Sequence, residues 1–321
     1  MSIFNTGVNR LRKNKVIPIF LTITNDYAKY AAVAIHSLTS HATPEQNYRI
    51  IILYDKLSLK NRWRLRDMVT KNCAIEFKQM KHNIYLQIIM KYCSTKTKSG
   101  DFYAAAVYYY RTFIARLFPQ YEKAIYIDSD VVLLGDIGEL FKVDLGEKII
   151  AARPDPKVSG IKIFADYVEN ALNVPAQEYV NSGVLLMNLK KLRKIHYITK
   201  MTDLIKEYNA DLVAPDQDYL NVILKGDILY LDEKWNAQAG DELPRDVRLV
   251  HYNLMKKPWF NDDAAQGDLF WNEAKNTRFY GDLMRGKEQY TVEDMEADEQ
   301  KMQALLDKAD KLSKLEKPIF G

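Results

Sequence analysis

Two aspartates separated by one serine interrupt an apolar run near the middle of the chain. The segment reads Lys123-Ala-Ile-Tyr-Ile-Asp128-Ser129-Asp130-Val-Val-Leu-Leu. Burying two carboxylates is unfavourable unless something offsets their charge, and a divalent cation is the natural partner. Carboxylate oxygens are hard ligands that suit Mg²⁺ or Mn²⁺. Because alternate residues of a strand share a face, a strand through this segment would aim Asp128 and Asp130 at the same ion.

A histidine ends a second apolar run, much further along the chain. The segment Leu249-Val-His251-Tyr leads into Lys256, Lys257 and a proline. A lone histidine at a strand end is more often a buried structural residue than a metal ligand. Beside two aspartates it would complete a three-residue ligand set, and the lysines would attract phosphate. The two segments together predict a site for a metal ion and a diphosphate.

Short runs rich in β-branched residues alternate with segments of helical periodicity. The predicted strands cover residues 16–23, 48–54, 124–128, 148–152, 183–187, 227–231 and 248–252. The predicted helices cover residues 27–40, 58–71, 103–118, 189–208 and 215–224. This alternation indicates an α/β fold with a mostly parallel central sheet flanked by helices. In such sheets ligands bind beyond the carboxyl ends of the strands, where the two aspartates and the histidine stand.

The last part of the chain differs in character from the rest. We expect residues 1–260 to form the main domain and residues 261–321 a small C-terminal helical extension. A helix start at Thr291 is followed by apolar residues at helical spacing, namely Met302, Leu305, Leu306, Ala309 and Leu312. The pattern predicts an amphipathic helix packed on the body of the protein. A membrane-surface or oligomer-forming helix is the alternative, although its mixed charges suit an anionic membrane poorly.

Composition narrows the class of protein. The 321 residues include 46 basic and 42 acidic side chains, for a net charge of +4, and 47% are hydrophobic. This is a globular composition that does not require a nucleic-acid partner, and we expect none. Cys73 and Cys93 are too few for a disulfide framework or a structural zinc site, which favours a cytoplasmic protein. Peripheral contact with the inner face of the membrane and homo-oligomerisation both stay open.

Five blocks of residues, taken together, resemble the family 8 glycosyltransferases. These are retaining, metal-dependent enzymes with a GT-A (Rossmann-like) fold, such as the bacterial lipopolysaccharide galactosyl- and glucosyltransferases. The resemblance covers about residues 16–260. The blocks, in the family's order, are Thr24-Asn-Asp-Tyr27-Ala, Tyr126-Ile-Asp128-Ser-Asp130-Val-Val, Asn181-Ser-Gly183-Val-Leu-Leu-Met-Asn188-Leu, Pro215-Asp216-Gln217-Asp218-Tyr-Leu-Asn and His251-Tyr-x₄-Lys257-Pro258-Trp259.

The resemblance implies a binding site for a UDP-sugar and a metal ion. Asp128, Asp130 and His251 would hold Mn²⁺ or Mg²⁺ against the donor diphosphate, which Lys257 would also bind. Tyr27 would pack on the uridine, with Thr22 and Thr24 beside the base and ribose. The remaining donor-site residues would surround the sugar and its phosphates; they are Arg111, Asn181, Ser182 and Gly183.

The implied reaction is transfer of a hexose, galactose or glucose, to a saccharide or lipid-linked saccharide acceptor. A cation and a lysine stabilise the diphosphate leaving group without proton transfer. The catalytic candidates are Gln217, Asp216 and Asp155. Retention would proceed by front-face attack, with Gln217 and Asp216 stabilising the cationic centre, or through a covalent intermediate. We expect a role in the synthesis of cell-surface polysaccharide or lipopolysaccharide.

Two departures from the family pattern keep a second hypothesis open. Thr24 stands where the family often has an acid, and Leu254 where it usually has glycine. The alternative is therefore a catalytically silent protein that binds nucleotide-sugars with the same fold. Acceptor contacts are predicted to come from loops around residues 80–102 and 156–180.

Overall fold

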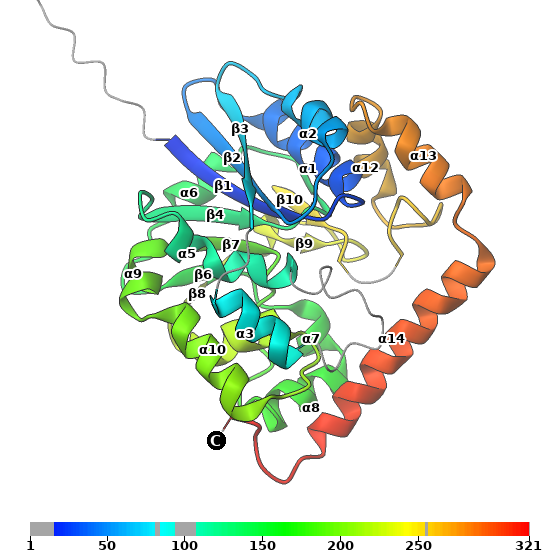
Figure 1. The fold of residues 1–321 in the computed structure, drawn as a ribbon. Helices are drawn as coiled ribbons and strands as arrows, with labels where there is room; N and C mark the ends of the chain where they lie inside the picture. Colours follow the sequence, from blue (N-terminus) through cyan, green and yellow to red (C-terminus); the bar gives the residue numbers. More distant parts are fainter. Residues whose placement is uncertain (1–15, 81–83, 94–106, 254–255, 321) are drawn as a thin grey trace, which may run out of the picture.

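The centre of the molecule is a seven-stranded sheet with the strand order β3-β2-β1-β4-β7-β6-β8 (Figure 1). A computed structural model describes residues 16–80, 84–93, 107–253 and 256–320 of the chain. The strands of this sheet are β1 (Val16–Ile23), β2 (Asn47–Tyr54), β3 (Cys73–Gln79), β4 (Lys123–Ile127), β6 (Ile150–Ala152), β7 (Val184–Asn188) and β8 (Ile228–Tyr230). Each of the seven predicted strand segments corresponds to a strand of the structure, with differences only at the ends. Six lie in this sheet, and residues 248–252 correspond to β10 (Leu249–His251).

Most neighbouring strands of this sheet run parallel. β1 pairs in parallel with β2 and β4, β2 with β3, and β6 with β8. Only β7 runs against its neighbours, β4 and β6. The prediction of an α/β fold with a mostly parallel sheet is confirmed.

A second, three-stranded sheet lies beside the first. It contains β5 (Val131–Leu133), β10 (Leu249–His251) and β9 (Ala237–Gln238). The chain leaves β4 at Ile127, crosses to the small sheet and enters β5 at Val131. Because β5 and β10 are antiparallel, His251 stands directly opposite Val131. This register places the histidine next to the crossing segment.

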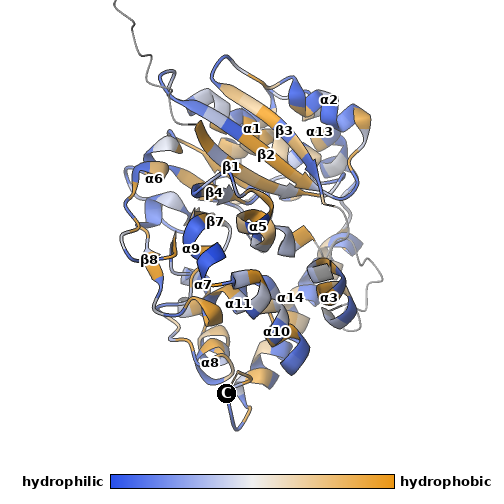
Figure 2. Cartoon of the chain, turned by 60° about the vertical axis from the view of Figure 1, so that its left-hand side comes forward, coloured by the Kyte–Doolittle hydropathy of each residue, from blue (hydrophilic) through white to orange (hydrophobic). Residues whose placement is uncertain are grey.

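Helices cover both faces of the large sheet. The face with Ile19 and Leu21 is covered by α1 (Ala28–His41), α2 (Leu59–Arg66) and α6 (Gly138–Lys142). Phe20 points to the opposite face. The helical segments packed there are α3 (Ile84–Cys93), η2 (Tyr110–Phe113), α5 (Ile114–Leu117), α8 (Lys162–Asn170), α9 (Leu189–Lys194), α10 (Tyr197–Tyr208) and α11 (Pro215–Ile223). Burial on both faces explains the continuous apolar strands, which Figure 2 shows at the centre of the molecule.

Several predicted helices differ from those observed. The single helix predicted for residues 189–208 is two, because His196 has a left-handed backbone (φ 53°) that ends α9 before α10 begins. The helix predicted for residues 58–71 starts as expected, with Ser58 accepting a hydrogen bond from Asn61 N, but it ends at Arg66. Of the helix predicted for residues 103–118, residues 103–106 lie outside the described residues. Residues 107–109 are helical as predicted, and the 3₁₀ turn η2 then interrupts the helix before α5.

The C-terminal helices pack on the body of the protein. They are α12 (Gly267–Ala274), α13 (Tyr280–Glu288) and α14 (Val292–Ser313). Thr291 and Asp294 form a reciprocal capping box that starts α14. Its Leu305, Leu306 and Ala309 contact the large core, and α14 runs from α13 down to α8 (Figure 1). The predicted amphipathic helix is confirmed, whereas the boundary at residue 260 stays a prediction.

No helix in the described ranges of the chain is both long enough and apolar enough to cross a membrane.

Candidate functional site

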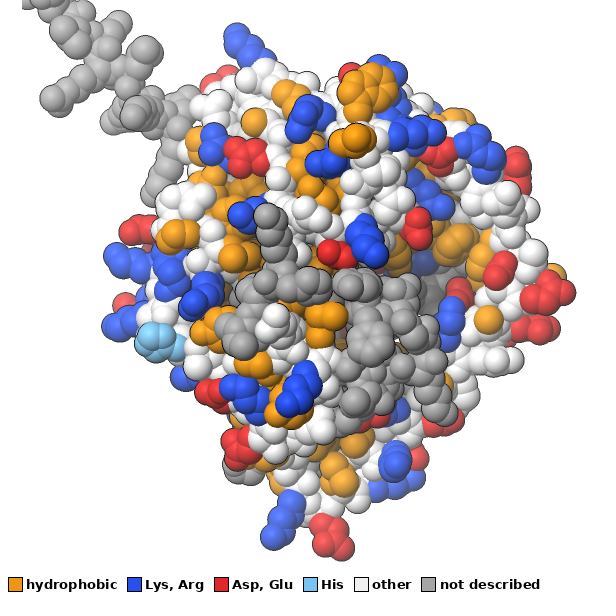
Figure 3. All heavy atoms as spheres, viewed as in Figure 1, with side chains coloured by type: hydrophobic (Ala, Val, Ile, Leu, Met, Phe, Trp, Pro, Cys, Tyr) orange, Lys and Arg blue, Asp and Glu red, His pale blue; other side chains and the backbone are white. Residues whose placement is uncertain are grey.

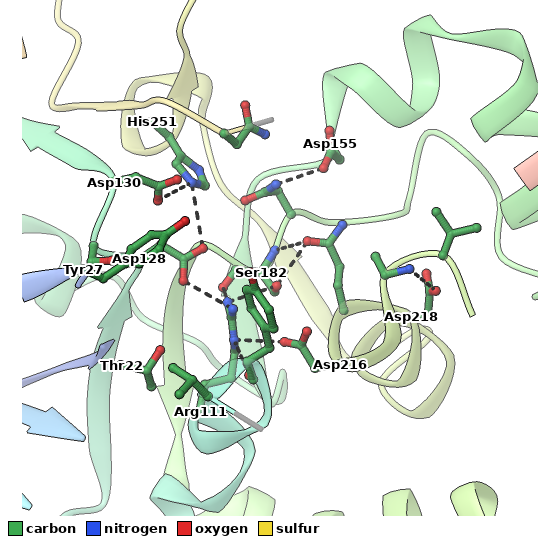
Figure 4. A pocket seen from close by; sticks show the side chains of 18 of the residues that line it. Thr22, Tyr27, Arg111, Asp128, Asp130, Asp155, Ser182, Asp216, Asp218 and His251 are labelled. Atoms are coloured by element: carbon green, nitrogen blue, oxygen red, sulfur yellow. Dashed lines mark hydrogen bonds and ion pairs between the residues drawn. The ribbon is translucent and has the colours of Figure 1, made fainter. Parts of the chain in front are cut away.

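A pocket of about 830 Å³ opens at the carboxyl ends of β1 and β4. Every predicted site residue except Gly183 lines it. Figure 4 shows side chains from both sheets and from the helices below converging on this cavity. The rule that ligands bind beyond the carboxyl ends of parallel strands therefore located the pocket correctly.

Asp128, Asp130 and His251 form one group at the junction of the two sheets. One ligand atom from each can be chosen so that all three lie within 4.8 Å of one another. The imidazole Nε2 is 3.2 Å from Asp130 Oδ1 and 3.8 Å from Asp128 Oδ2. The expectation that a strand aligns the aspartates was wrong, since both lie in the turn between β4 and β5. They converge because the chain changes sheets there, with Tyr252 N donating to Asp130 O at 2.9 Å.

Positive groups surround the two carboxylates. Lys257 Nζ is 2.7 Å from Asp130 Oδ2 and also donates to Tyr252 O. Burial alone would raise the pKa of Asp130, but Lys257 and His251 hold it well below its usual range. Tyr126 donates to Asp128 Oδ1 at 2.7 Å, and an Arg111 nitrogen lies 3.3 Å from the same oxygen. The lowered pKa of Asp130 favours its anionic form, which is the form that binds a cation.

The donor set and the space around it fit a divalent ion. Two carboxylates and one imidazole are ligands that Mn²⁺ accepts and that leave positions open for substrate oxygens. Gly183 makes room for them. A Cβ atom at this position would lie 2.8 Å from Asp128 Oδ2 and 2.9 Å from His251 Nδ1. The close approach explains why glycine stands here, since any side chain would displace two of the three ligands.

Two buried amides connect His251 to Asp155. Asn181 Nδ2 donates to Asp155 Oδ2 at 2.9 Å, and its Oδ1 accepts from Asn236 Nδ2 at 3.0 Å. Asn236 Oδ1 then lies 3.0 Å from His251 Nδ1. Because a carboxylate can only accept, each amide has one orientation, and Asn236 must accept a proton from Nδ1. In a neutral imidazole, the form that can bind a metal ion, this network would place the proton on Nδ1 and leave the Nε2 lone pair facing the two aspartates.

Sequence reasoning missed Asn236 and Gln238. Both are fully buried, and Gln238 Nε2 donates to Asp155 Oδ1 at 3.2 Å. Their only signal in the sequence is two amides alternating with apolar Trp235 and Ala237, which is common in any half-buried strand. Their role depends on contacts with residues far away in the chain.

Arg111 lies at the floor of the pocket between two acidic groups. Its guanidinium is 3.3 Å from Asp128 Oδ1 and 2.9 Å from Asp216 Oδ2, and it donates to Ser182 O at 2.7 Å. The Asp216 oxygen is close to Arg111 without hydrogen-bond alignment. Burial raises the pKa of Asp216 to about 6, although Arg111 opposes the shift. Gln217 Oε1 accepts from Ser182 N and Oγ at 2.9 and 3.1 Å.

The rim of the pocket next to β1 carries the predicted nucleotide-binding residues. Thr22 Oγ1 and Tyr126 OH form a hydrogen bond of 2.9 Å. Thr24 Oγ1 accepts from Tyr27 N at 3.3 Å, which fixes the turn before α1. The Tyr27 side chain is 42% exposed and stands edge-on to Tyr30 with ring centroids 5.3 Å apart. Leu254, the second departure from the family pattern, lies outside the described residues.

An apolar wall continues the pocket away from the aspartates. It includes Val158 and Phe164 together with Leu305 of α14. The segments expected to be acceptor loops are partly helical here, since α7 (Pro156–Gly160) and α8 occupy residues 156–170 and α3 occupies residues 84–93. Pro156 follows the capping residue Asp155, whose side chain accepts from Lys157 N at 3.0 Å.

Comparisons with known proteins show which family of sequences and which fold this chain shares. A profile of the family described as Glycosyl transferase family 8 matches residues 18–263. General stress protein A of Bacillus subtilis (strain 168) is 24% identical over 271 residues, covering 78% of this chain and 89% of that protein. Lipopolysaccharide 1,2-glucosyltransferase of Escherichia coli (strain K12) is 27% identical over 168 residues, covering 47% and 48% of the two chains. The solved structure of galactosyltransferase LgtC with donor and acceptor sugar analogs has a TM-score of 0.67 and 24% identity, covering 83% and 99%. That likeness shows a shared GT-A fold.

Proposed function

The chain belongs to glycosyltransferase family 8, and from this premise we propose that it is a metal-dependent, retaining hexosyltransferase. It transfers galactose or glucose from a UDP-sugar to a saccharide or glycolipid acceptor. The observation that carries the proposal is the convergence of Asp128, Asp130 and His251 beside Lys257 inside the pocket.

Asp128, Asp130 and His251 would hold Mn²⁺ or Mg²⁺. When bound, the ion supplies positive charge that stabilises the departing diphosphate. Lys257 adds a second positive charge next to the same oxygens, and its position 2.7 Å from Asp130 marks where a phosphate oxygen would be attracted. The leaving group is UDP, which needs no proton to depart.

The other pocket residues bind and orient the donor. Tyr27 stacks on the uracil, while Thr22 and Thr24 flank the base and ribose. Around the sugar stand Arg111, Asp155, Asn181, Ser182 and Gly183. Ser182 holds the carboxamide of Gln217 by two hydrogen bonds, which fixes the side chain beneath the reacting sugar.

Asp216 and Gln217 stabilise the positive charge that develops on the sugar carbon. Burial raises the pKa of Asp216 to about 6, and the Arg111 guanidinium beside it favours the ionised form. The acceptor hydroxyl attacks from the face that the diphosphate leaves, which retains the anomeric configuration. The bond from the sugar carbon to the diphosphate oxygen breaks, the glycosidic bond forms, and the hydroxyl proton passes to the departing diphosphate. Relatives named as lipopolysaccharide glucosyltransferase and galactosyltransferase support a hexose donor and an acceptor of the cell surface.

A donor screen tests the proposal. Purified protein is incubated with Mn²⁺ and each of UDP-glucose, UDP-galactose, UDP-N-acetylglucosamine and GDP-mannose, and nucleotide release is measured with and without EDTA. We expect release from one UDP-hexose that EDTA abolishes. Asp130→Asn should abolish it too, whereas Asp203→Asn, which changes an exposed surface carboxylate, should not.

UDP binding is measured by calorimetry on the same samples. Binding of UDP without release from any donor, in the presence of simple saccharide acceptors, would favour the catalytically silent alternative. Absence of both binding and release would overturn the proposed function.

A further inference from the structure

The outer face of α2 carries two apolar side chains that project into solvent. Leu59 is 76% exposed and Trp63 is 59% exposed, and they stand one helical turn apart on the same face. Together they present two apolar tips to the solvent on one side of the helix. They stand singly among charged groups, so they do not form the broad apolar patch of a stable protein interface.

Basic side chains surround Trp63. Lys60 and Arg64 of α2 line one shallow hollow of about 410 Å³ with Arg278 and Arg285, next to Trp63 itself. The Arg278 guanidinium stands over the indole ring, 4.9 Å from its centroid. Figure 3 shows basic and apolar side chains mixed over α2 and α13 at the top of the molecule.

The acidic groups of this surface do not balance the basic ones. Arg278 pairs with Asp67, while Arg64 and Arg285 share Asp282. Lys60 and Arg66 are both exposed and add two further positive charges. Five basic side chains against two acidic ones leave a net charge of +3. The surface formed by Leu59, Lys60, Trp63, Arg64, Arg66, Asp67, Arg278, Asp282 and Arg285 is called the α2–α13 face below.

We propose that the α2–α13 face docks on an anionic lipid bilayer. Tryptophan is the residue that favours the level of the lipid headgroups, and Leu59 would enter the acyl boundary beside it. The exposed basic residues of the face, namely Lys60, Arg66, Arg278 and Arg285, would meet lipid phosphates, whereas Arg64 is buried. Net positive charge around isolated apolar tips fits a negatively charged, fluid surface better than a rigid protein partner.

The start of α2 contacts the rim of the pocket. Asn25 lines the pocket rim, and its side chain accepts hydrogen bonds from Ser58 N and Asn61 Nδ2 at the start of α2. A bilayer against α2 would therefore adjoin the rim of the pocket. This part of the inference rests on the proposed function: a bilayer at the rim would bring an acceptor sugar carried on a lipid close to the pocket.

Trp63 itself provides the test. Of the four tryptophans, Trp235 and Trp259 are buried and Trp271 is half-buried, so Trp63 is the most exposed. Full-length protein is titrated with vesicles of phosphatidylcholine alone or mixed with phosphatidylglycerol, without donor or metal. We expect a blue shift of tryptophan emission and cosedimentation only with the anionic vesicles, both reversed by high salt.

Matched variants locate the contact. Lys60→Glu with Arg66→Glu should weaken vesicle binding by about 25-fold or more, since each basic residue contributes about fivefold. Lys162→Glu with Lys190→Glu makes the same charge change on exposed residues elsewhere and should have a much smaller effect. Leu59→Ala with Trp63→Ala should remove the blue shift and weaken binding. Circular dichroism confirms that each variant is folded.

Three results would overturn the proposal. They are no binding to anionic vesicles, equal loss in the two charge-reversal pairs, or a concentration-dependent dimer that the Trp63 variant abolishes, which would make this face a contact between copies. Asp130→Asn should bind vesicles like the unmodified protein. Failure of the docking and failure of the proposed catalysis are thereby measured separately.

Discussion

Asn236 Oδ1 lies 3.0 Å from His251 Nδ1, and the two side chains are buried together behind the aspartates. The amide receives its orientation from Asn181 and, through it, from Asp155. A residue proposed to face the sugar is thereby connected to a proposed metal ligand through hydrogen bonds alone. Metal binding and donor positioning should therefore depend on some of the same buried groups.

Replacing Asn236 should weaken metal binding. In Asn236→Ala the imidazole loses the acceptor that fixes its proton on Nδ1. Only part of the population then has an unprotonated Nε2 that can bind the metal ion. We expect Mn²⁺ affinity to fall about 10- to 100-fold, measured by calorimetry. The NMR nitrogen shifts of His251 should show a mixture of tautomers. Thr202→Val, which removes a buried hydroxyl on α10, is the control and should leave Mn²⁺ affinity unchanged.

Gly183→Ala should disrupt the metal group sterically. The new methyl group would approach Asp128 and His251 more closely than van der Waals contact allows. We expect a loss of about 1–3 kcal/mol in the free energy of unfolding by urea, together with reduced Mn²⁺ affinity. Gly160→Ala is matched to it, because nothing lies within 4 Å of its added methyl group. Similar behaviour of the two variants would contradict the close approach.

Asp216→Asn should stabilise the protein at neutral pH. The folded pKa of about 6 is higher than the value of about 3.9 in an unfolded chain. The folded state therefore binds more protons between pH 4 and 6, and stability falls as the pH rises through that window. We expect the variant to unfold with a free energy higher by on the order of 2 kcal/mol at pH 7.5, and with almost no difference at pH 4. Urea unfolding at the two pH values measures this, and transfer activity should be lost.

Tyr27→Ala should weaken UDP binding. Loss of a stacking face of this size corresponds to about 1–2 kcal/mol, or a Kd raised about 5- to 30-fold. The measurement is calorimetric titration with UDP in the presence of Mn²⁺. Tyr230→Ala removes a tyrosine of similar exposure at the end of β8 and should leave the Kd unchanged. An unchanged Kd in the Tyr27 variant would place the base elsewhere.

The sequence by itself determined the fold class and most of the pocket. Apolar runs alternating with helical segments define the two-sided sheet because burial on both faces requires continuous apolar strands. Polar residues directly after those runs, such as Thr24 and Asp128, had to collect at one edge of it. Helix ends were less well predicted, since His196 and Arg66 end helices where the side-chain periodicity continues.

Only the tertiary structure decided how the pieces meet. The antiparallel register of β5 and β10 sets His251 opposite Val131, and the change of sheet after β4 turns both aspartates toward it. The role of Asn236 follows only from its hydrogen bonds. The positive charge around Trp63 follows only from the packing of α2 beside α13. The physical reason is that periodicity reports which side of an element faces the core. Hydrogen bonds and surface charge depend on partners from distant parts of the chain, which periodicity does not encode.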